Sequence, residues 1–384
     1  MKNLIELRLG GTSIGELPLR LEYLTGLRTL ELINCKNLEF IPNSICNLKH
    51  LQRFGISYCP KIDKFPTIAA SLCSLTDLQV DYCSSLSEIS NEIGCLSSLR
   101  RLSLLGSNIT TIPAGIKLLI NLVALWVSDS KRLQSLPDLP PSLVHLEASN
   151  YPSLTKVSNR WETISGMACH SINYDVFIMN FSNCLNLDPY ARDNILGEME
   201  NAVKNFSFDR CTPHEMIVKV PGSEILKWFP YQSSGPSLTI KWIPPTSGMI
   251  RFVLCVVFAI EDRIRENELA YKWETKIGDH LTKMSRTYFQ YDINEFFEQD
   301  HMIVNWYFDW PSDPHLWCNS DGYHNVTFTI LHPHPDKNNH NFKVKIVGVN
   351  PIILSQHNNK RSQLVVEGEH SAKIMKKTSL TTLG

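Results

Sequence analysis

The residues best suited to hold a metal ion are three histidines and one aspartate in the stretch HPHPDKNNH. His332, His334 and His340 offer imidazole nitrogens and Asp336 offers a carboxylate, all of which are ligands that zinc accepts. Their spacing fits no closed zinc site, and the two prolines of HPHP favour an extended loop between strands. We therefore expect no bound metal and no other cofactor.

Candidate nucleophiles and sugar-binding groups are equally incomplete. Ser223 lacks the G-x-S-x-G elbow of a hydrolase, and Cys255 lies in the apolar stretch RFVLCVVF, where we expect a buried thiol. Asp309 and Asp313 lie close to two tryptophans, which leaves a carbohydrate cleft as an alternative to an ordinary loop beside a β-sandwich core. The sequence thus offers no assembled catalytic site, and we predict that the chain is not an enzyme.

Composition restricts the classes of partner. The chain has 384 residues, 43% of them hydrophobic and 20% charged, and a net charge of -1. This balance gives no electrostatic reason to expect nucleic acid or an anionic membrane as the partner. The longest apolar run, Met249 to Ile260, contains Arg251 and is shorter than the roughly 20 residues that a membrane-spanning helix needs.

Cysteine usage points to a reducing compartment. Eleven cysteines are present and none forms a C-x-x-C pair, so we expect reduced, buried thiols. The N-terminal residues MKNLIELRLGG contain no signal-peptide core. A cytoplasmic or nuclear location follows as the expectation.

One repeated pattern organises the first part of the chain, and LRTLELINCKNLEFIP (residues 27–42) shows it most plainly. Copies begin at Leu4, Leu27, Leu51, Leu75, Leu99, Leu122 and Leu143. Successive starts differ by 23, 24, 24, 24, 23 and 21 residues, which is the period of a leucine-rich repeat. The sequence therefore predicts a solenoid of about seven coils with parallel strands on its concave face.

Strand alternation separates the core residues of each coil from the exposed ones. Leu30 and Leu32 point inward, whereas Glu31 between them points outward. Cys35, at the turn after this strand, is expected to be a small core residue. The outward residues form columns on the concave face, and we predict that these columns bind a protein ligand; they comprise Arg8, Glu31, Arg53, Asp77, Gln79, Asp81, Arg101, Ser103, Leu105, Trp126, His145 and Glu147.

Four regions follow from these patterns. We assign residues 1–157 to the repeats, 158–210 to a closing connector with a helix near 189–204, 211–355 to an all-β sandwich, and 356–384 to a disordered polar tail. Asp188 is the expected N-cap of the helix and Pro189 its first residue. No polar cap precedes the first repeat, so we expect the sequence to be the downstream part of a longer chain or a truncated gene model.

Two stretches after the repeats carry a family resemblance. FSNCLNLDPYARDNIL (181–196) and VPGSEILKWFPYQSSGPSLTI (220–240) resemble the post-repeat region of plant disease-resistance proteins of the Toll/interleukin-1-receptor, nucleotide-binding, leucine-rich-repeat class. The FVLCVVF and VKIVGV blocks look like strands of the jelly-roll/Ig-like domain of that family, known as C-JID. Leu226 and Lys227 depart from the family's usual Pro-Glu pair.

The resemblance implies the recognition part of an intracellular immune receptor, which binds a pathogen effector or a guarded host protein. The chain has no phosphate-binding loop, so neither nucleotide binding nor NAD cleavage carries over to it, and oligomer formation is expected only within a full receptor. An alternative is a stand-alone adaptor or decoy that binds a full-length receptor. A sugar-binding or enzymatic β-sandwich is a further alternative.

Overall fold

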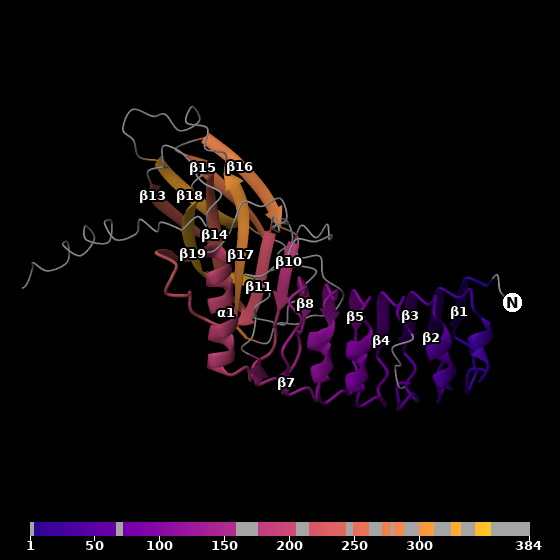
Figure 1. Ribbon diagram of the computed structural model, residues 1–384. Coiled ribbons are helices and arrows are strands. Elements are labelled where there is room, and N and C mark those ends of the chain that lie inside the picture. Colours follow the sequence, from indigo (N-terminus) through magenta and orange to yellow (C-terminus); the bar gives the residue numbers. More distant parts are fainter. Residues whose placement is uncertain are drawn as a thin grey trace, which may run out of the picture.

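The computed structural model shows a solenoid of parallel strands that continues into antiparallel strands at its C-terminal end (Figure 1). It describes residues 4–66, 72–158, 176–204, 215–242, 249–260, 271–277, 280–287, 299–310, 324–331 and 342–354. The histidine-rich stretch around His332 and the predicted C-terminal tail lie outside these residues.

A strand stands in each of the seven predicted coils. These strands are β1 (Glu6–Gly10), β2 (Thr29–Ile33), β3 (Arg53–Ser57), β4 (Asp77–Asp81), β5 (Arg101–Ser103), β6 (Ala124–Trp126) and β8 (His145–Glu147). Each pairs in parallel with the next, and equivalent residues of the repeat stand opposite one another. The predicted leucine-rich-repeat solenoid is confirmed.

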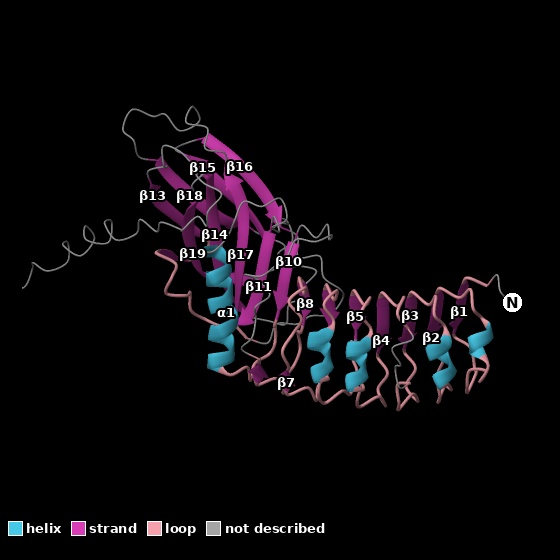
Figure 2. Ribbon diagram, in the orientation of Figure 1, coloured by secondary structure: helices cyan, strands magenta, loops and turns pink. Residues whose placement is uncertain are grey.

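The inward leucines of the coils form one continuous core. Leu30 and Leu32 are fully buried, because alternation along β2 points both away from the concave face. Among the described residues, the convex side carries short 3₁₀ helices in four of the coils (Figure 2): η1 (Leu21–Tyr23), η2 (Asn43–Asn47), η3 (Asn91–Cys95) and η4 (Ala114–Leu118). Two short strands, β7 (Ser135–Leu136) and β9 (Lys156–Val157), pair in parallel in a separate small sheet.

An eighth coil-like unit lies within the region that the sequence analysis assigned to a connector. Strand β10 (Val176–Asn180) pairs in parallel with β8, and its Ile178 stands opposite His145. The turn after β10 repeats the turn after β2, because NCLNL (183–187) matches NCKNL (34–38) at every residue but the third. The segment between β8 and β10 is much longer than the segments between the concave strands of the other coils, and this hid the repeat.

Helix α1 (Pro189–Lys204) follows this unit and covers the residues at which the sequence places a helix. The carboxylate of Asp188 accepts the N–H of Tyr190 at 2.7 Å, which satisfies one donor of the first turn. Ile195 and Met199 bury their side chains in the same core as the repeat leucines. The helix is thereby packed against the end of the solenoid.

The large sheet changes direction at β11 (Glu215–Pro221). This strand pairs in parallel with β10 on one side and antiparallel with β17 (His301–Trp310) on the other. β14 (Met249–Ile260), β19 (Phe342–Leu354) and β12 (Tyr231–Ser234) complete a sheet of 13 strands. A second sheet contains β13 (Ser237–Trp242), β18 (His324–Leu331), β15 (Tyr271–Ile277) and β16 (His280–Thr287).

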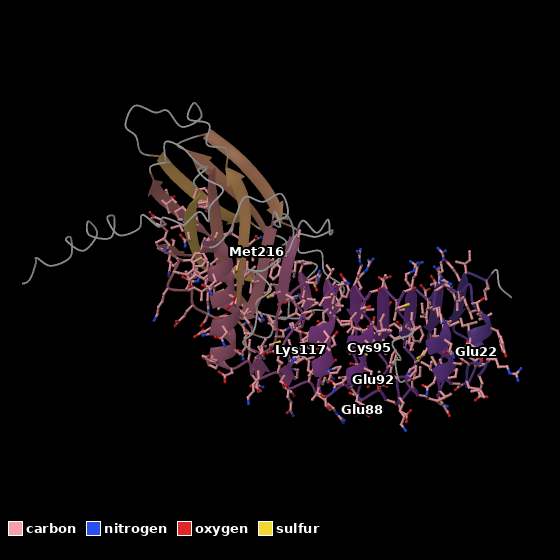
Figure 3. All side chains as sticks on the ribbon, in the orientation of Figure 1. Glu22, Glu88, Glu92, Cys95, Lys117 and Met216 are labelled. Carbon is pink, nitrogen blue, oxygen red and sulfur yellow. The ribbon has the colours of Figure 1, made fainter. Side chains whose placement is uncertain are left out.

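Alternate residues of β11 enter two different cores. Met216 (labelled in Figure 3) and Val218 join the core of the repeats, whereas Ile217 joins a second cluster. That second cluster contains Leu238 of β13 and Phe328 of β18, so the second sheet packs on the face of β11 that is continuous with the concave face of the solenoid. The concave face therefore ends against another layer.

Candidate functional site

The strand register brings the predicted concave residues into columns. Across β1 to β8, the middle column runs Arg8, Glu31, Gly55, Gln79, Ser103, Trp126, Glu147. A flanking column runs Glu6, Thr29, Arg53, Asp77, Arg101, Ala124, His145. With about 4.8 Å between paired strands, the seven positions of a column extend over about 29 Å. The arrangement is an ordered grid of side chains.

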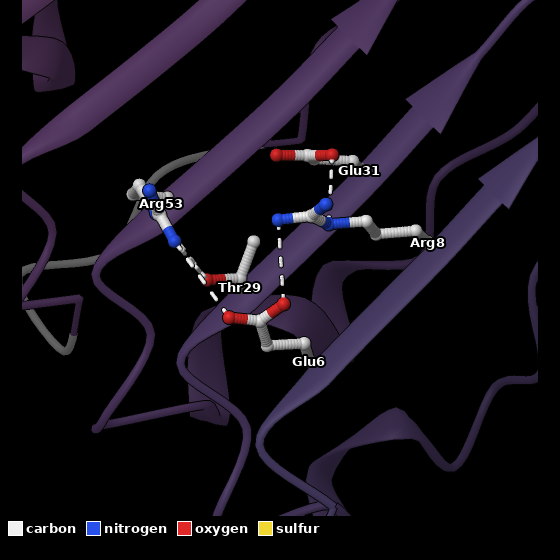
Figure 4. A network of polar contacts seen from close by, with 5 residues as sticks. All are labelled: Glu6, Arg8, Thr29, Glu31 and Arg53. Carbon is white, nitrogen blue, oxygen red and sulfur yellow. Dashed lines mark hydrogen bonds and ion pairs between the residues drawn. The ribbon is translucent and has the colours of Figure 1, made fainter.

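Opposite charges alternate at the N-terminal end of this grid (Figure 4). Arg8 lies 3.3 Å from the Glu6 carboxylate and 3.2 Å from that of Glu31. Arg53 donates to the Thr29 hydroxyl at 3.3 Å and lies 3.8 Å from Glu6.

One strand further on in the same column, Arg101 pairs with Asp77 at 2.6 Å. The arginine side chains are more than half exposed and solvent screens them, so the pairs add little stability but hold the charged groups in fixed positions.

Asp81 is buried, which corrects its expected place on the exposed face. Its carboxylate accepts the Ser103 hydroxyl at 2.6 Å, the Leu105 N–H at 2.9 Å and the Gln79 amide at 2.7 Å. Burial raises the pKa of this carboxyl, and the three hydrogen bonds oppose that shift. Asp81 thus ties its own coil to the next one and is not available to a ligand as an exposed charge.

Glu147 is also buried, contrary to the expectation for an outward residue. Its carboxylate accepts the Asn180 amide at 2.6 Å, and Asn180 pairs in register with Lys219 of β11. All three side chains are buried and lie in the direct continuation of the middle column. The column therefore becomes less exposed as it approaches the post-repeat strands. Its last members join the repeats to those strands.

Trp126 and His145 mark the point where the exposed part of the grid ends. Both are half-buried, and their ring centroids are 5.2 Å apart. Burial lowers the pKa of His145 to about 4, and the nearby charge of Lys219 adds to the effect. At neutral pH this end of the grid is therefore an uncharged aromatic surface beside the charged ladder.

The repeat-equivalent cysteines are core residues, as the sequence analysis expected. The thiol of Cys35 donates to the Leu9 carbonyl at 2.9 Å, and that of Cys184 donates to the Ala148 carbonyl at 3.1 Å. Burial raises the pKa of Cys83 to about 12. Thiols held in this way are protonated at neutral pH and are poor nucleophiles.

Other chemistry finds no support in the described part of the chain. No group of three or more histidine, cysteine or acidic side chains is placed to hold a metal ion among the described residues. The described helices include none with the length and apolar character that a bilayer crossing requires. The histidines from His332 to His340 lie outside the described residues.

Several residues of this surface were missed from the sequence. Glu6 lies two residues before Arg8 on the same face of β1, so strand alternation could have identified it. Asn180 and Lys219 continue the middle column, but they follow the long segment that hid the eighth coil. The repeated NC-x-NL wording was the available signal.

Comparison with known proteins gives the following similarities. A family model described as "Leucine-rich repeat region" matches residues 1–105. Disease resistance-like protein DSC1 of Arabidopsis thaliana is 30% identical over 323 residues, covering 68% of this chain and 26% of the relative. Disease resistance protein RPS4 of the same plant is 30% identical over 270 residues, covering 68% of this chain and 21% of the relative.

Two further similarities complete the comparison. TMV resistance protein N of Nicotiana glutinosa is 24% identical over 361 residues, covering 77% of this chain and 31% of the relative. The leucine-rich repeat domain of the type III effector XCV3220 (XopL) has a TM-score of 0.42 and 21% identity, and the match covers 48% of this chain and 63% of that domain. The chain spans about a quarter of the length of the first curated relatives that it matches.

Proposed function

Because this chain is homologous to part of the plant disease-resistance proteins of the Toll/interleukin-1-receptor, nucleotide-binding, leucine-rich-repeat class, we propose that it is the ligand-recognition module of an intracellular immune receptor. Its ligand is a pathogen effector or a guarded host protein. The module itself is non-enzymatic, acts in the cytoplasm or nucleus, and forms oligomers only as part of a full receptor.

The observation that carries this proposal is the concave grid. Its charged ladder, from Arg8 to Arg101, holds side chains of both signs in fixed register, and its other end presents the Trp126 and His145 rings. Protein interfaces favour such a mixture, in which an aromatic or arginine anchor lies beside polar groups. A small molecule would need an enclosed site, which an open sheet face does not provide.

We further propose that the two packed sheets form the jelly-roll/Ig-like C-JID domain, with residues 211–355 as its extent. In this assignment residues 1–157 are the repeats, 158–210 lead from the repeats to that domain and include the eighth coil-like unit, and residues 356–384 lie outside the described part of the chain. The shared core of Ile217, Leu238 and Phe328 supports the β-sandwich assignment. Because the second sheet packs beyond the end of the concave face, the proposed ligand contacts both parts.

Charge reversal on the two faces of the solenoid tests the proposal. The full chain is screened against a yeast-displayed library of secreted plant-pathogen proteins, and each hit is measured again with Arg101→Glu and with Lys117→Glu. Lys117 lies on η4 of the convex side and is labelled in Figure 3, so it is the matched control. Binding that falls at least about tenfold with Arg101→Glu and is unchanged with Lys117→Glu supports the concave face. Hits that lose binding only with Lys117→Glu contradict it.

A further inference from the structure

One residue with positive φ ends the strand of each coil. The eight equivalent positions are Gly11 (φ 65°), Asn34 (57°), Tyr58 (56°), Tyr82 (53°), Gly106 (59°), Asp129 (65°), Asn150 (61°) and Asn183 (58°). Seven of the backbone N–H groups bond across to the next coil, as from Asn34 to the Ser57 carbonyl at 2.8 Å, and that of Asn183 donates to the His301 ring at 2.9 Å. Glycine, asparagine and aspartate are the residue types that tolerate this conformation.

Tyr58 and Tyr82 are the exceptions in this row. A bulky side chain at positive φ is strained, and such strain persists only where the surrounding structure maintains it, most often at functional sites. Their rings stack in parallel, with centroids 4.8 Å apart and an interplanar angle of 4°. Both rings are nevertheless accessible, since 54% of Tyr58 and 37% of Tyr82 is exposed.

Gly106 supplies the floor of this stack. A Cβ atom at this glycine would lie 2.3 Å from Cδ1 of Tyr82, so any other residue type here would displace the ring. The order along the solenoid is therefore the Gly106 backbone, the Tyr82 ring and the Tyr58 ring. Three successive coils thus contribute to one platform.

The platform presents positive and donor groups to solvent. Stacking covers the facing sides of the two rings, the exposed surface of the pair includes electropositive ring edges, and the Tyr58 O–H is a hydrogen-bond donor. Lys36, two residues after Asn34 in the preceding coil, is exposed and makes no ion pair among the described residues. The neighbouring carboxylates are engaged elsewhere, since Asp81 is buried and Glu39 pairs with Lys61 at 2.9 Å.

We propose that Ile33, Lys36, Tyr58 and Tyr82, here called the tyrosine edge, form a second protein-contact site that takes an acidic segment of a partner protein. Carboxylates of the partner bond to the Lys36 ammonium and the Tyr58 hydroxyl, and an apolar side chain packs on Ile33, which is 45% exposed. Lys36, Tyr58 and Tyr82 lie beyond the ends of the strands, and Ile33, the last residue of β2, lies outside the two columns of the grid. The Lys36 and tyrosine variants therefore test this site separately from those columns.

The test uses the full chain and a displayed library of random 12-residue peptides. Peptides are selected on the wild-type chain and then measured on a Tyr58→Asn/Tyr82→Asn double variant. Asparagine is the chain's own residue at the equivalent positions 34, 150 and 183, so the variant keeps a suitable backbone, and its melting midpoint verifies folding. Lys36→Glu tests the charge, and Lys131→Glu, at the equivalent place two residues after Asp129, is its control.

The expected result is an excess of aspartate and glutamate in the selected peptides. Their affinity should fall at least about tenfold with the double variant and with Lys36→Glu, and should be unchanged with Lys131→Glu. Selected peptides without acidic bias, an empty selection, or equal binding by the double variant would overturn the proposal. A lowered melting midpoint together with unchanged peptide binding would also overturn it, because the stack would then serve only the fold.

Discussion

The indole ring of Trp126 leans against the imidazole ring of His145, with centroids 5.2 Å apart and 47° between the ring planes. The two side chains come from neighbouring strands, β6 and β8, and lie where the concave face becomes buried. Each ring thereby limits the rotamers of the other. A ligand at this end of the grid would meet a surface that is already ordered, and little side-chain entropy would be lost on binding.

Removing the indole tests whether this surface is a binding anchor. Trp126→Ala should weaken binding of a concave-face protein ligand by roughly 30-fold or more, because buried aromatic anchors commonly contribute about 2 kcal/mol or more. The melting midpoint should change little, since the side chain is only half-buried. Affinity and thermal unfolding are measured on the same sample. An unchanged affinity with a lowered midpoint would assign Trp126 to the fold alone.

His145 should make stability depend on pH. Its pKa is lowered by burial from 6.5 to about 4, so between these two pH values the unfolded chain binds more protons at this site than the folded chain. Above pH 6.5 the imidazole is neutral in both states and does not reduce stability. As pH falls from 6.5 towards 4, protonation of the unfolded chain lowers the free energy of unfolding by up to about 3 kcal/mol.

The measurement is urea unfolding at several pH values between 4 and 7. His145→Gln should flatten the pH dependence, whereas His50→Gln, at an exposed position, should leave the wild-type slope in place. Identical slopes for the wild type and His145→Gln would contradict a lowered pKa for this half-buried imidazole.

Gly94 of η3 and Gly115 of η4 allow these neighbouring 3₁₀ helices of the convex side to approach closely. A Cβ atom on Gly115 would lie 2.2 Å from the Asn91 carbonyl oxygen, so Gly115→Ala should destabilise the chain by about 1–3 kcal/mol. Gly15→Ala is the control, because the nearest atom to its Cβ would be 3.7 Å away and the change should stay within about 0.5 kcal/mol. Equal midpoints for the two variants in urea unfolding would show that η3 and η4 separate at little cost.

Asn180 should be critical for the junction between the repeats and the post-repeat strands. Its amide donates to Glu147 at 2.6 Å, and its side-chain oxygen accepts the Ser182 N–H at 2.9 Å. Asn180→Ala removes these bonds from a buried site, and we expect a loss of about 3 kcal/mol or more in the free energy of unfolding. Asn121→Ala removes a single exposed bond to the Ser97 carbonyl and should cost less than about 1 kcal/mol. Similar losses for both variants would exclude a special role for the junction.

The repeats could be predicted from the sequence because each coil carries its own copy of the same information. Leu30 and Leu32 identify a strand and its buried face, and the same pair returns in later coils at nearly constant spacing. The eighth coil escaped notice since β10 follows β8 after a longer segment. A repeat can be recognised from its spacing only where successive copies keep nearly the same length.

Alternation along a strand predicted the faces of the site residues but not their exposure. It assigned Asp81 and Glu147 to the outward side, and both are buried by contacts with other coils. Exposure depends on what the neighbouring strands place around a side chain, which one coil's sequence does not contain. The strain at Tyr58 and Tyr82 was missed for a related reason, because only the turn geometry shows that these residues replace asparagine.

The buried contact between Glu147 and Asn180 joins the last repeats to the post-repeat strands at one end of the array. Elsewhere along the array, each strand pairs only with those of the adjacent coils. Duplication or deletion of one unit of about 24 residues upstream of β6 would lengthen or shorten the concave face by one strand spacing. The junction and the strands after it would keep their register. Unequal recombination within a gene can therefore rescale the ligand footprint in whole steps, and natural variants that differ by a complete coil are expected to fold.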